Sequence, residues 1–206
     1  MNAPVIDFYW DLGSTNTYFA LKLLPPIAAK YGAEIRYQPF NLGFVFQSQK
    51  YVLMQEPADK LNHRLVDLKR WAAKYDLPFI RPTQFPIKTA RALRGAIAMR
   101  DWDLEVPYIE AIFKEYWELD NGEIGEYSQL RLIAERLGVE GAVFEATAES
   151  DRVRSALIHA TNQGRERGVF GAPSMMLTGE LYWGKDRFEF LEDHLSQLVS
   201  ALKGEA

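Results

Sequence analysis

The stretch VIDFYWDLGSTNTYFALKLL, residues 5–24, decides the fold class of this chain. Residues 5–10 are mostly β-branched or aromatic, as in a buried strand, and residues 11–13 follow them as a turn signal. Ser14 or Asn16 can then cap a helix, because such side chains accept a hydrogen bond from a free backbone N–H. A second strand is expected over residues 34–39. Strand, helix and strand at this length predict a βαβ unit with two parallel strands.

Residues 44–167 have a different pattern, in which apolar side chains recur at helical spacing. Helices are expected near residues 61–72, 90–99, 107–116, 130–137 and 151–165. The helix that follows residue 14 is expected to kink or break at Pro25 and Pro26, since each ring removes a backbone donor. Strand signals return at 174–177 and 181–183 and predict a hairpin, which a last helix follows.

The order βαβ, helices, ββα predicts an α/β chain of thioredoxin-like fold with an inserted all-helical domain. The thioredoxin-like domain is discontinuous in this prediction and takes residues 1–43 and 168–206. The inserted helical domain takes residues 44–167.

Composition excludes several classes of protein. The 206 residues are 48% hydrophobic, enough for a substantial core, and a net charge of -4 without a clustered basic surface argues against nucleic-acid binding. No apolar run is long enough to span a membrane and the first residues lack a signal-peptide pattern, so we expect a cytoplasmic protein without membrane contact. His63, His159 and His194 have no partners at metal-ligand spacing, so no metal site is expected.

The chain contains no cysteine. Disulfides, thiolate metal sites and a cysteine nucleophile are therefore excluded, and a dithiol oxidoreductase is excluded with them. Any thiol chemistry at this chain must use a thiol from another molecule.

Ser14 is the first candidate for chemistry. It follows the first strand, where open α/β sheets place their ligands, and it opens a helix whose free N–H groups favour an anion. Its hydroxyl can donate a hydrogen bond to a thiolate, and the helix N-terminus lowers the pKa of a thiol there. A simple N-cap explains the same residue, and the local sequence leaves both readings open.

Two later clusters are also candidates. Pro173 stands directly before the third strand, where a cis bond would leave the backbone of Ala172 free for a ligand, although most X-Pro bonds are trans. Asp186 and Glu189 fit a capping box for the last helix, or Asp186 and nearby amides bind an amino-acid-like group.

Together these segments resemble the 2-hydroxychromene-2-carboxylate isomerase family, the bacterial branch of the kappa-class glutathione transferases, which is related to the disulfide oxidoreductase DsbA. The resemblance rests on IDFYWDLGSTNTYFALKLL (6–24), PFNLG (39–43), FPIKTARALRG (85–95), GVFGAPSMML (168–177) and LYWGKDRFEFLEDHL (181–195). It spans nearly the whole chain. It implies a thioredoxin fold with an inserted helical domain, a homodimer and glutathione as cofactor.

The resemblance also implies roles for residues. Ser14 would contact the glutathione sulfur as the catalytic residue. The two cysteines of the Cys-x-x-Cys motif of DsbA-like relatives would fall on Ser14 and Thr17. Pro173 would be cis, and the backbone of Ala172 would pair with the cysteinyl part of glutathione. The γ-glutamyl end would bind at Lys185 and Asp186, with Trp183 and Gly184 completing this cofactor-binding set.

The activity implied is a glutathione-dependent isomerisation of 2-hydroxychromene-2-carboxylate to trans-benzylidenepyruvate, a step of aromatic catabolism, by reversible thiolate addition. The substrate is a small aromatic carboxylate or another electrophile, and Lys50, Lys88, Arg91 and then Arg94 are candidates to bind its carboxylate.

The sequence departs from the family on the substrate side. Thr15 and Asn16 replace a proline and an aromatic residue, Gln49-Lys50-Tyr51 lacks a Gly-Asn pair, and Lys88 replaces an asparagine. Two alternatives therefore stay open. One is a kappa-type glutathione transferase or peroxidase that acts on another electrophile, and the other is a non-catalytic DsbA-like binding protein.

Overall fold

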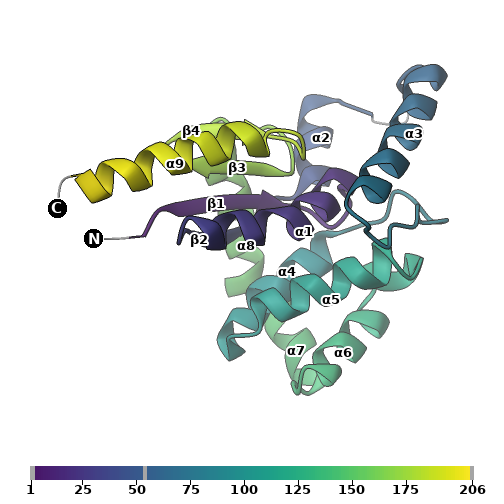
Figure 1. The fold of residues 1–206 in the computed structure, drawn as a ribbon. Helices are drawn as coiled ribbons and strands as arrows, with labels where there is room; N and C mark the ends of the chain where they lie inside the picture. Colours follow the sequence, from purple (N-terminus) through teal and green to yellow (C-terminus); the bar gives the residue numbers. More distant parts are fainter. Residues whose placement is uncertain (1–2, 53–54, 205–206) are drawn as a thin grey trace.

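The computed structural model describes residues 3–52 and 55–204 (Figure 1). Its sheet consists of β1 (Val5–Trp10), β2 (Glu34–Pro39), β3 (Ser174–Leu177) and β4 (Glu180–Trp183). The α-helices in these residues are α1 (Thr15–Lys30), α2 (Leu42–Gln49), α3 (Ala58–Lys74), α4 (Ala90–Met99), α5 (Glu105–Trp117), α6 (Tyr127–Arg136), α7 (Gly141–Ala148), α8 (Asp151–Glu166) and α9 (Phe188–Gly204). Short 3₁₀ helices lie at Arg100–Trp102 and Gly122–Gly125.

The strands follow the order β2-β1-β3-β4. β1 and β2 are parallel, with Phe8 opposite Tyr37, whereas β3 is antiparallel to β1 and β4 is antiparallel to β3. Thr178 and Gly179 form the turn between β3 and β4, and their φ angles of 50° and 91° are those that a type I′ hairpin turn requires. The predicted βαβ unit and the predicted hairpin are both confirmed.

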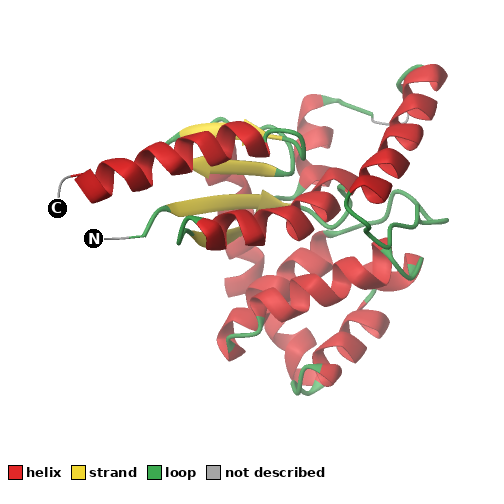
Figure 2. Ribbon diagram, viewed as in Figure 1, coloured by secondary structure: helices red, strands yellow, loops and turns green. Residues whose placement is uncertain are grey.

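Helices cover both faces of the sheet (Figure 2). In the views of Figures 1 and 2, α1 and α9 lie on one face and α8 lies behind the other. The alternation of side chains along β1 explains this arrangement, because Phe8 and Trp10 join the main core while Tyr9 packs with Phe40 in a second cluster. Gly164 of α8 lies against that cluster, and a Cβ atom there would be 2.9 Å from the Tyr9 ring.

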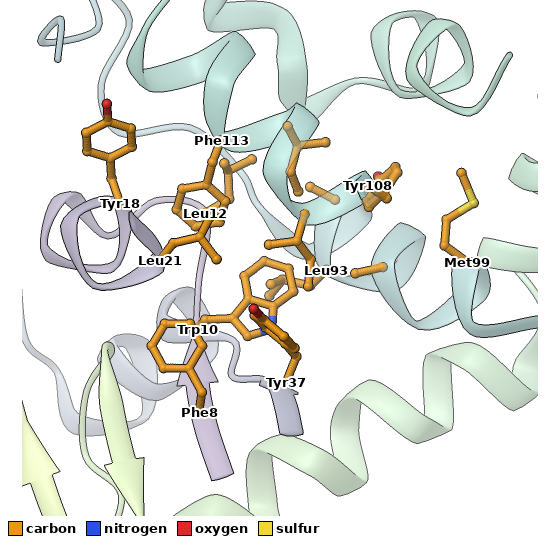
Figure 3. Close-up of a cluster of buried hydrophobic side chains, with 14 of the residues drawn as sticks. Phe8, Trp10, Leu12, Tyr18, Leu21, Tyr37, Leu93, Met99, Tyr108 and Phe113 are labelled. Atoms are coloured by element: carbon orange, nitrogen blue, oxygen red, sulfur yellow. The ribbon is translucent and has the colours of Figure 1, made fainter. Parts of the chain in front are cut away.

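The main core continues from the sheet into helices α4–α7 (Figure 3). Trp10 at the end of β1 packs against Phe113 of α5, with the two ring centroids 5.8 Å apart. Tyr18 of α1 packs in the same way on Trp117, at 6.4 Å. Helical segments begin at Leu42, slightly before residue 44, and the division of the chain into two domains stays a prediction.

Helix α1 was predicted to kink or break at Pro25 and Pro26; it runs without a break from Thr15 to Lys30, so the predicted break is wrong. A proline ring fixes φ near the helical value, and the loss is confined to two backbone hydrogen bonds. The buried stripe that includes Leu21, Leu24 and Ala28 packs the residues on both sides of the two prolines against the core. Burial of that stripe outweighs the lost hydrogen bonds.

Other differences lie at the ends of elements. Helices α2 and α7 are additional to those expected. Helix α9 begins at Phe188, one residue too late for Asp186 to be its N-cap, and the Asp186 carboxylate instead pairs with Arg187 at 2.8 Å. None of the helices within the described residues has both the length and the apolar character that crossing a membrane requires.

Candidate functional site

A cleft of about 570 Å³ opens beyond the C-terminal end of β1. Its walls come from the start of α1, from α2, from α3 and from the segment before β3. The lining residues are Gly13, Ser14, Thr15, Asn16, Leu42, Phe46, Gln49, Tyr51, Glu56, Lys60, Arg64, Leu68, Phe85, Phe170, Gly171, Ala172 and Trp183. This size and this mixture of apolar and polar groups are typical of a small-molecule site.

Ser14 lies at the floor of the cleft as the N-cap of α1. Its Oγ accepts a hydrogen bond from the Thr17 N–H at 3.2 Å, so the capping interpretation is confirmed. The same hydroxyl donates to the carbonyl oxygen of Ala172 at 2.7 Å, across 158 residues of sequence. The serine therefore joins the start of α1 to the segment before β3.

The Ala172–Pro173 peptide bond is cis, as the family resemblance implied. The Pro173 carbonyl accepts from the Gly184 N–H at 3.0 Å, which ties this segment to the end of β4. Gly171 lies directly against the indole of Trp183, because a Cβ atom at Gly171 would be 2.7 Å from its Nε1 atom. A glycine is therefore needed for Trp183 to form this part of the rim.

Three charged side chains of the α3 region form one wall of the cleft. The Glu56 carboxylate accepts from the Tyr51 hydroxyl at 2.8 Å and from Lys60 at 3.1 Å, and it also pairs with Arg64. The Tyr51 hydrogen bond and then the Lys60 ammonium hold the pKa of Glu56 below its usual range. One carboxylate thus faces two cations, which leaves this wall with a net positive charge. Sequence reasoning missed these residues.

Only part of the predicted cofactor set lines the cleft. Ser14, Ala172 and Trp183 do, whereas Pro173 and Gly184 are not among the lining residues. Lys185 is buried, with its Nζ atom 4.2 Å from the centroid of the Trp71 ring and 3.4 Å from Asp67. The exposed Asp186 lies outside the lining. The roles of these residues in binding stay predictions.

The predicted substrate cations lie outside the lining of the cleft. Lys50 and Lys88 are exposed, and Lys50 ends α2. Arg91 pairs with Glu126, and Arg94 pairs with Glu149. Within the residues that the structure describes, the cations that line the cleft are Lys60 and Arg64.

Asp11 is a further residue that sequence reasoning passed over as part of a turn. Its carboxylate is 1% exposed and accepts hydrogen bonds from the Gly13 N–H, the Leu42 N–H and the Thr89 hydroxyl. Burial raises the pKa of this carboxyl from its ordinary value to about 6, against the opposing effect of the three hydrogen bonds.

The histidines take no part in the cleft. His194 contacts the Tyr182 hydroxyl at 2.8 Å, on the side of β4 that faces α9. In the described parts of the chain, no three His, Asp or Glu side chains are grouped as metal ligands would be.

Comparison with known proteins gives matches over most of the chain. Residues 5–196 match the model of the DSBA-like thioredoxin domain. The 2-hydroxychromene-2-carboxylate isomerase of Sphingobium xenophagum is 30% identical over 92% of this chain and 97% of its own length. The glutathione S-transferase kappa 1 of Caenorhabditis elegans is 26% identical over 94% of this chain and 92% of its own length.

Solved structures agree with these matches. A 2-hydroxychromene-2-carboxylate isomerase superposes with a TM-score of 0.85 at 28% identity, covering 98% of this chain and 99% of that one. The cytosolic disulfide reductase DsbM of Pseudomonas aeruginosa, solved with GSH, has the same fold at a TM-score of 0.66 and 20% identity, covering 97% of this chain and 99% of that one. The chain has the thioredoxin-like fold of DSBA-like domains and belongs to the 2-hydroxychromene-2-carboxylate isomerase family.

Proposed function

We propose that this protein is a glutathione-dependent isomerase that converts 2-hydroxychromene-2-carboxylate-type substrates to trans-benzylidenepyruvates. The observation that carries the proposal is the Ser14 hydroxyl at the floor of the cleft, bonded to Ala172, at the N-terminus of α1 in a chain without cysteine. The activity for which the isomerase relatives are named supports the reaction, and the kappa transferase and the DsbM structure with GSH support the cofactor.

The residues of the cleft fit glutathione. Ser14 has one hydroxyl proton, and in this structure that proton is held by the Ala172 carbonyl. Turning the hydroxyl toward a sulfur would free that carbonyl to accept from an amide N–H of the ligand. The α1 N-terminus adds positive potential at the same point, which favours a thiolate. Bound glutathione would supply the nucleophilic thiol that this chain lacks.

The substrate side of the cleft fits an aromatic carboxylate. We propose Lys60 and Arg64, in place of Lys50, Lys88 and Arg91, as the cations that receive the carboxylate, because they line the cleft. Phe46, Phe85 and Phe170 give the apolar surface that an aromatic ring needs. The reaction is an isomerisation, so glutathione is regenerated and no oxidant or reductant is consumed.

The kappa transferase relative favours a second candidate, a glutathione transferase or peroxidase acting on another electrophile at the same cleft. A panel of electrophiles compared with the chromene carboxylate separates the two activities. The third reading, a non-catalytic DsbA-like binding protein, predicts no turnover of any of them. The homodimer and the cytoplasmic location remain predictions from the sequence.

The test is to replace Ser14 and a second capping serine. Ser14→Ala should lower glutathione-dependent turnover by about 100-fold, the usual cost of removing one donor to a developing anion. Ser150→Ala is the matched control, because Ser150 caps α8 through the Val153 N–H and lies outside the lining of the cleft. Each variant loses a helix cap worth about 1 kcal/mol, so only Ser14→Ala should lose activity.

Full activity in Ser14→Ala would refute the role of this serine. Calorimetry of the wild-type protein with glutathione provides the second readout, and an absence of binding there would refute the proposed cofactor.

A further inference from the structure

The Asp11 carboxylate lies between two walls of the cleft and bonds to both. Oδ1 accepts from the Gly13 N–H at 2.7 Å, and Gly13 belongs to the loop that carries Ser14. Oδ2 accepts from the Leu42 N–H at 2.9 Å, and Leu42 is the first residue of α2. The Thr89 hydroxyl, just before α4, also donates to Oδ2, at 3.1 Å. Gly13 and Leu42 both line the cleft.

We propose that Asp11 is a positioning residue, whose carboxylate holds the Ser14 loop and helix α2 at the separation that the ligand requires. This inference rests on the proposed function where it concerns glutathione. The statement that the Asp11 side chain couples the two walls does not depend on the ligand or on the proposed function.

A carboxylate suits this position better than an amide. Two backbone N–H groups converge on its two oxygens, and each needs an acceptor. An asparagine would turn its NH₂ group toward one of these N–H groups and lose that bond, whichever way the amide is placed. Asp11→Asn therefore uncouples one wall and changes the volume of the side chain very little.

The charge of Asp11 is balanced by hydrogen bonds and by no cation of the described residues. Asp11 makes no ion pair with any Lys or Arg that the structure describes, and ionising a buried carboxylate is costly. A buried acid with a raised pKa beside a cleft is a candidate for a functional role. The loop is also held by Trp117, whose Nε1–H donates to the Leu12 carbonyl at 2.9 Å. Trp117 thus also holds the Ser14 loop, whereas the bond from this loop to α2 through Leu42 is made by Asp11.

Protonation should weaken the same coupling. A protonated carboxyl has an O–H on one oxygen, which then donates, for example to Thr89, and accepts poorly from Leu42. The raised pKa of Asp11, about 6, places this change in a mildly acidic range.

Other ionisable groups lie near Asp11 on α5 and at the start of α4. On α5, burial and the charge of Asp11 raise the pKa of Tyr116 well above its usual value, so Tyr116 stays neutral. At the start of α4, the Lys88 side chain is exposed and Arg91 is paired with Glu126. We therefore assign to Asp11 any change in the coupling of the two walls that occurs near pH 6.

The first experiment needs no ligand. Amide hydrogen exchange is measured on the wild-type protein, on Asp11→Asn and on Asp7→Asn. Asp7 is the matched control, because it is a largely buried aspartate of β1, the strand that Asp11 directly follows, and it pairs with Arg167 at 2.7 Å, outside the lining of the cleft. Asp11→Asn should speed exchange by about tenfold in whichever of the two segments, residues 12–17 or residues 42–49, loses its hydrogen bond to the charged group, whereas Asp7→Asn should speed it in neither.

The second experiment measures binding of S-methylglutathione by calorimetry between about pH 5 and 7, where neither its carboxyl groups nor a thiol can titrate. Wild-type and Asp7→Asn affinity should fall about tenfold as the pH drops through the pKa of Asp11. Asp11→Asn should bind about tenfold more weakly at pH 7 and show no such fall. Thr89→Val removes one hydrogen bond to the charged form and should move the fall to higher pH.

Unchanged exchange in Asp11→Asn would overturn the coupling of the walls. A fall in affinity that persists in Asp11→Asn would overturn its link to the ligand. Failure of the wild-type protein to bind either glutathione or S-methylglutathione, with the exchange result intact, would instead count against the proposed function alone.

Discussion

Glu56 sets how much positive charge the cleft offers to an anion. Its carboxylate pairs with Lys60 and with Arg64, so part of the charge of the two cations is already neutralised. An arriving carboxylate must compete with Glu56 for the same donors. The affinity for an anionic substrate therefore depends on this acid as much as on the two cations.

Substitutions in this group should change KM in opposite directions. Arg64→Met should raise the KM for a substrate carboxylate by about tenfold, since a charge-assisted hydrogen bond is lost. Glu56→Gln should lower that KM, because it removes the competing charge. Steady-state kinetics with separate kcat and KM values measure both effects. Lys50→Met is the control, since Lys50 lies outside the lining of the cleft, and a larger effect there would restore Lys50 as the substrate cation.

At the scale of elements, helix α1 contains an unusual local conflict. Two prolines lie inside it, and the exposed Pro26 contributes little to the core. An interior proline costs about 3 kcal/mol relative to alanine, although its stiffness in the unfolded chain returns part of that. The helix persists because its buried stripe packs against the core.

Pro26→Ala should therefore raise the free energy of unfolding by roughly 2 kcal/mol. The new N–H can donate to the Lys22 carbonyl, and no buried surface is lost. Urea unfolding of the variant and of the wild-type protein measures the difference. A lower stability would mean that the helix depends on the proline geometry at this turn.

The sequence predicted those elements whose ends are marked by a sharp change in residue type. The βαβ unit and the hairpin were predicted because residue types change sharply at their ends. Helix α2 was missed although Asn41 caps it through the Phe44 N–H, because Leu42-Gly43 is a weak helix start. The predicted break at Pro25 and Pro26 was wrong because a rule based on local sequence does not include the packing of α1 against the core.

The same reasoning separates the site residues. Ser14, Ala172 and Trp183 belong to local motifs, so they could be named from the sequence. Glu56, Lys60 and Arg64 have the charge pattern of an ordinary solvent-facing helix, and only the placement of α3 brings them to the cleft. Asp11 gave one signal, an acid directly after a buried strand, but its three partners lie up to 78 residues away.

At the scale of the whole molecule, the core does not stop at the predicted domain boundaries. Side chains from β1 and α1 share one buried cluster with those of α4–α7, and Trp10 and Phe113 meet across the boundary. Two domains with separate cores could unfold independently, but a shared core couples them.

We therefore expect a single unfolding transition in urea. Far-ultraviolet circular dichroism, which reports mainly on the helices, should coincide with tryptophan fluorescence. Phe113→Ala should lower the stability by about 3–5 kcal/mol and shift both signals together. Two separated transitions, or a variant that shifts only the circular dichroism, would show that the helical insertion folds as its own unit.

Trp183 at the rim gives the protein an optical property of its own. The chain has five tryptophans, of which Trp10 and Trp117 are buried and Trp71 and Trp102 are partly buried. Trp183 is 49% exposed, and it lies in the lining of the cleft. A ligand in the cleft would displace water from the Trp183 indole and leave the other four indoles in nearly unchanged surroundings. The emission spectrum then records ligand entry without a label, and its blue shift belongs to one known residue.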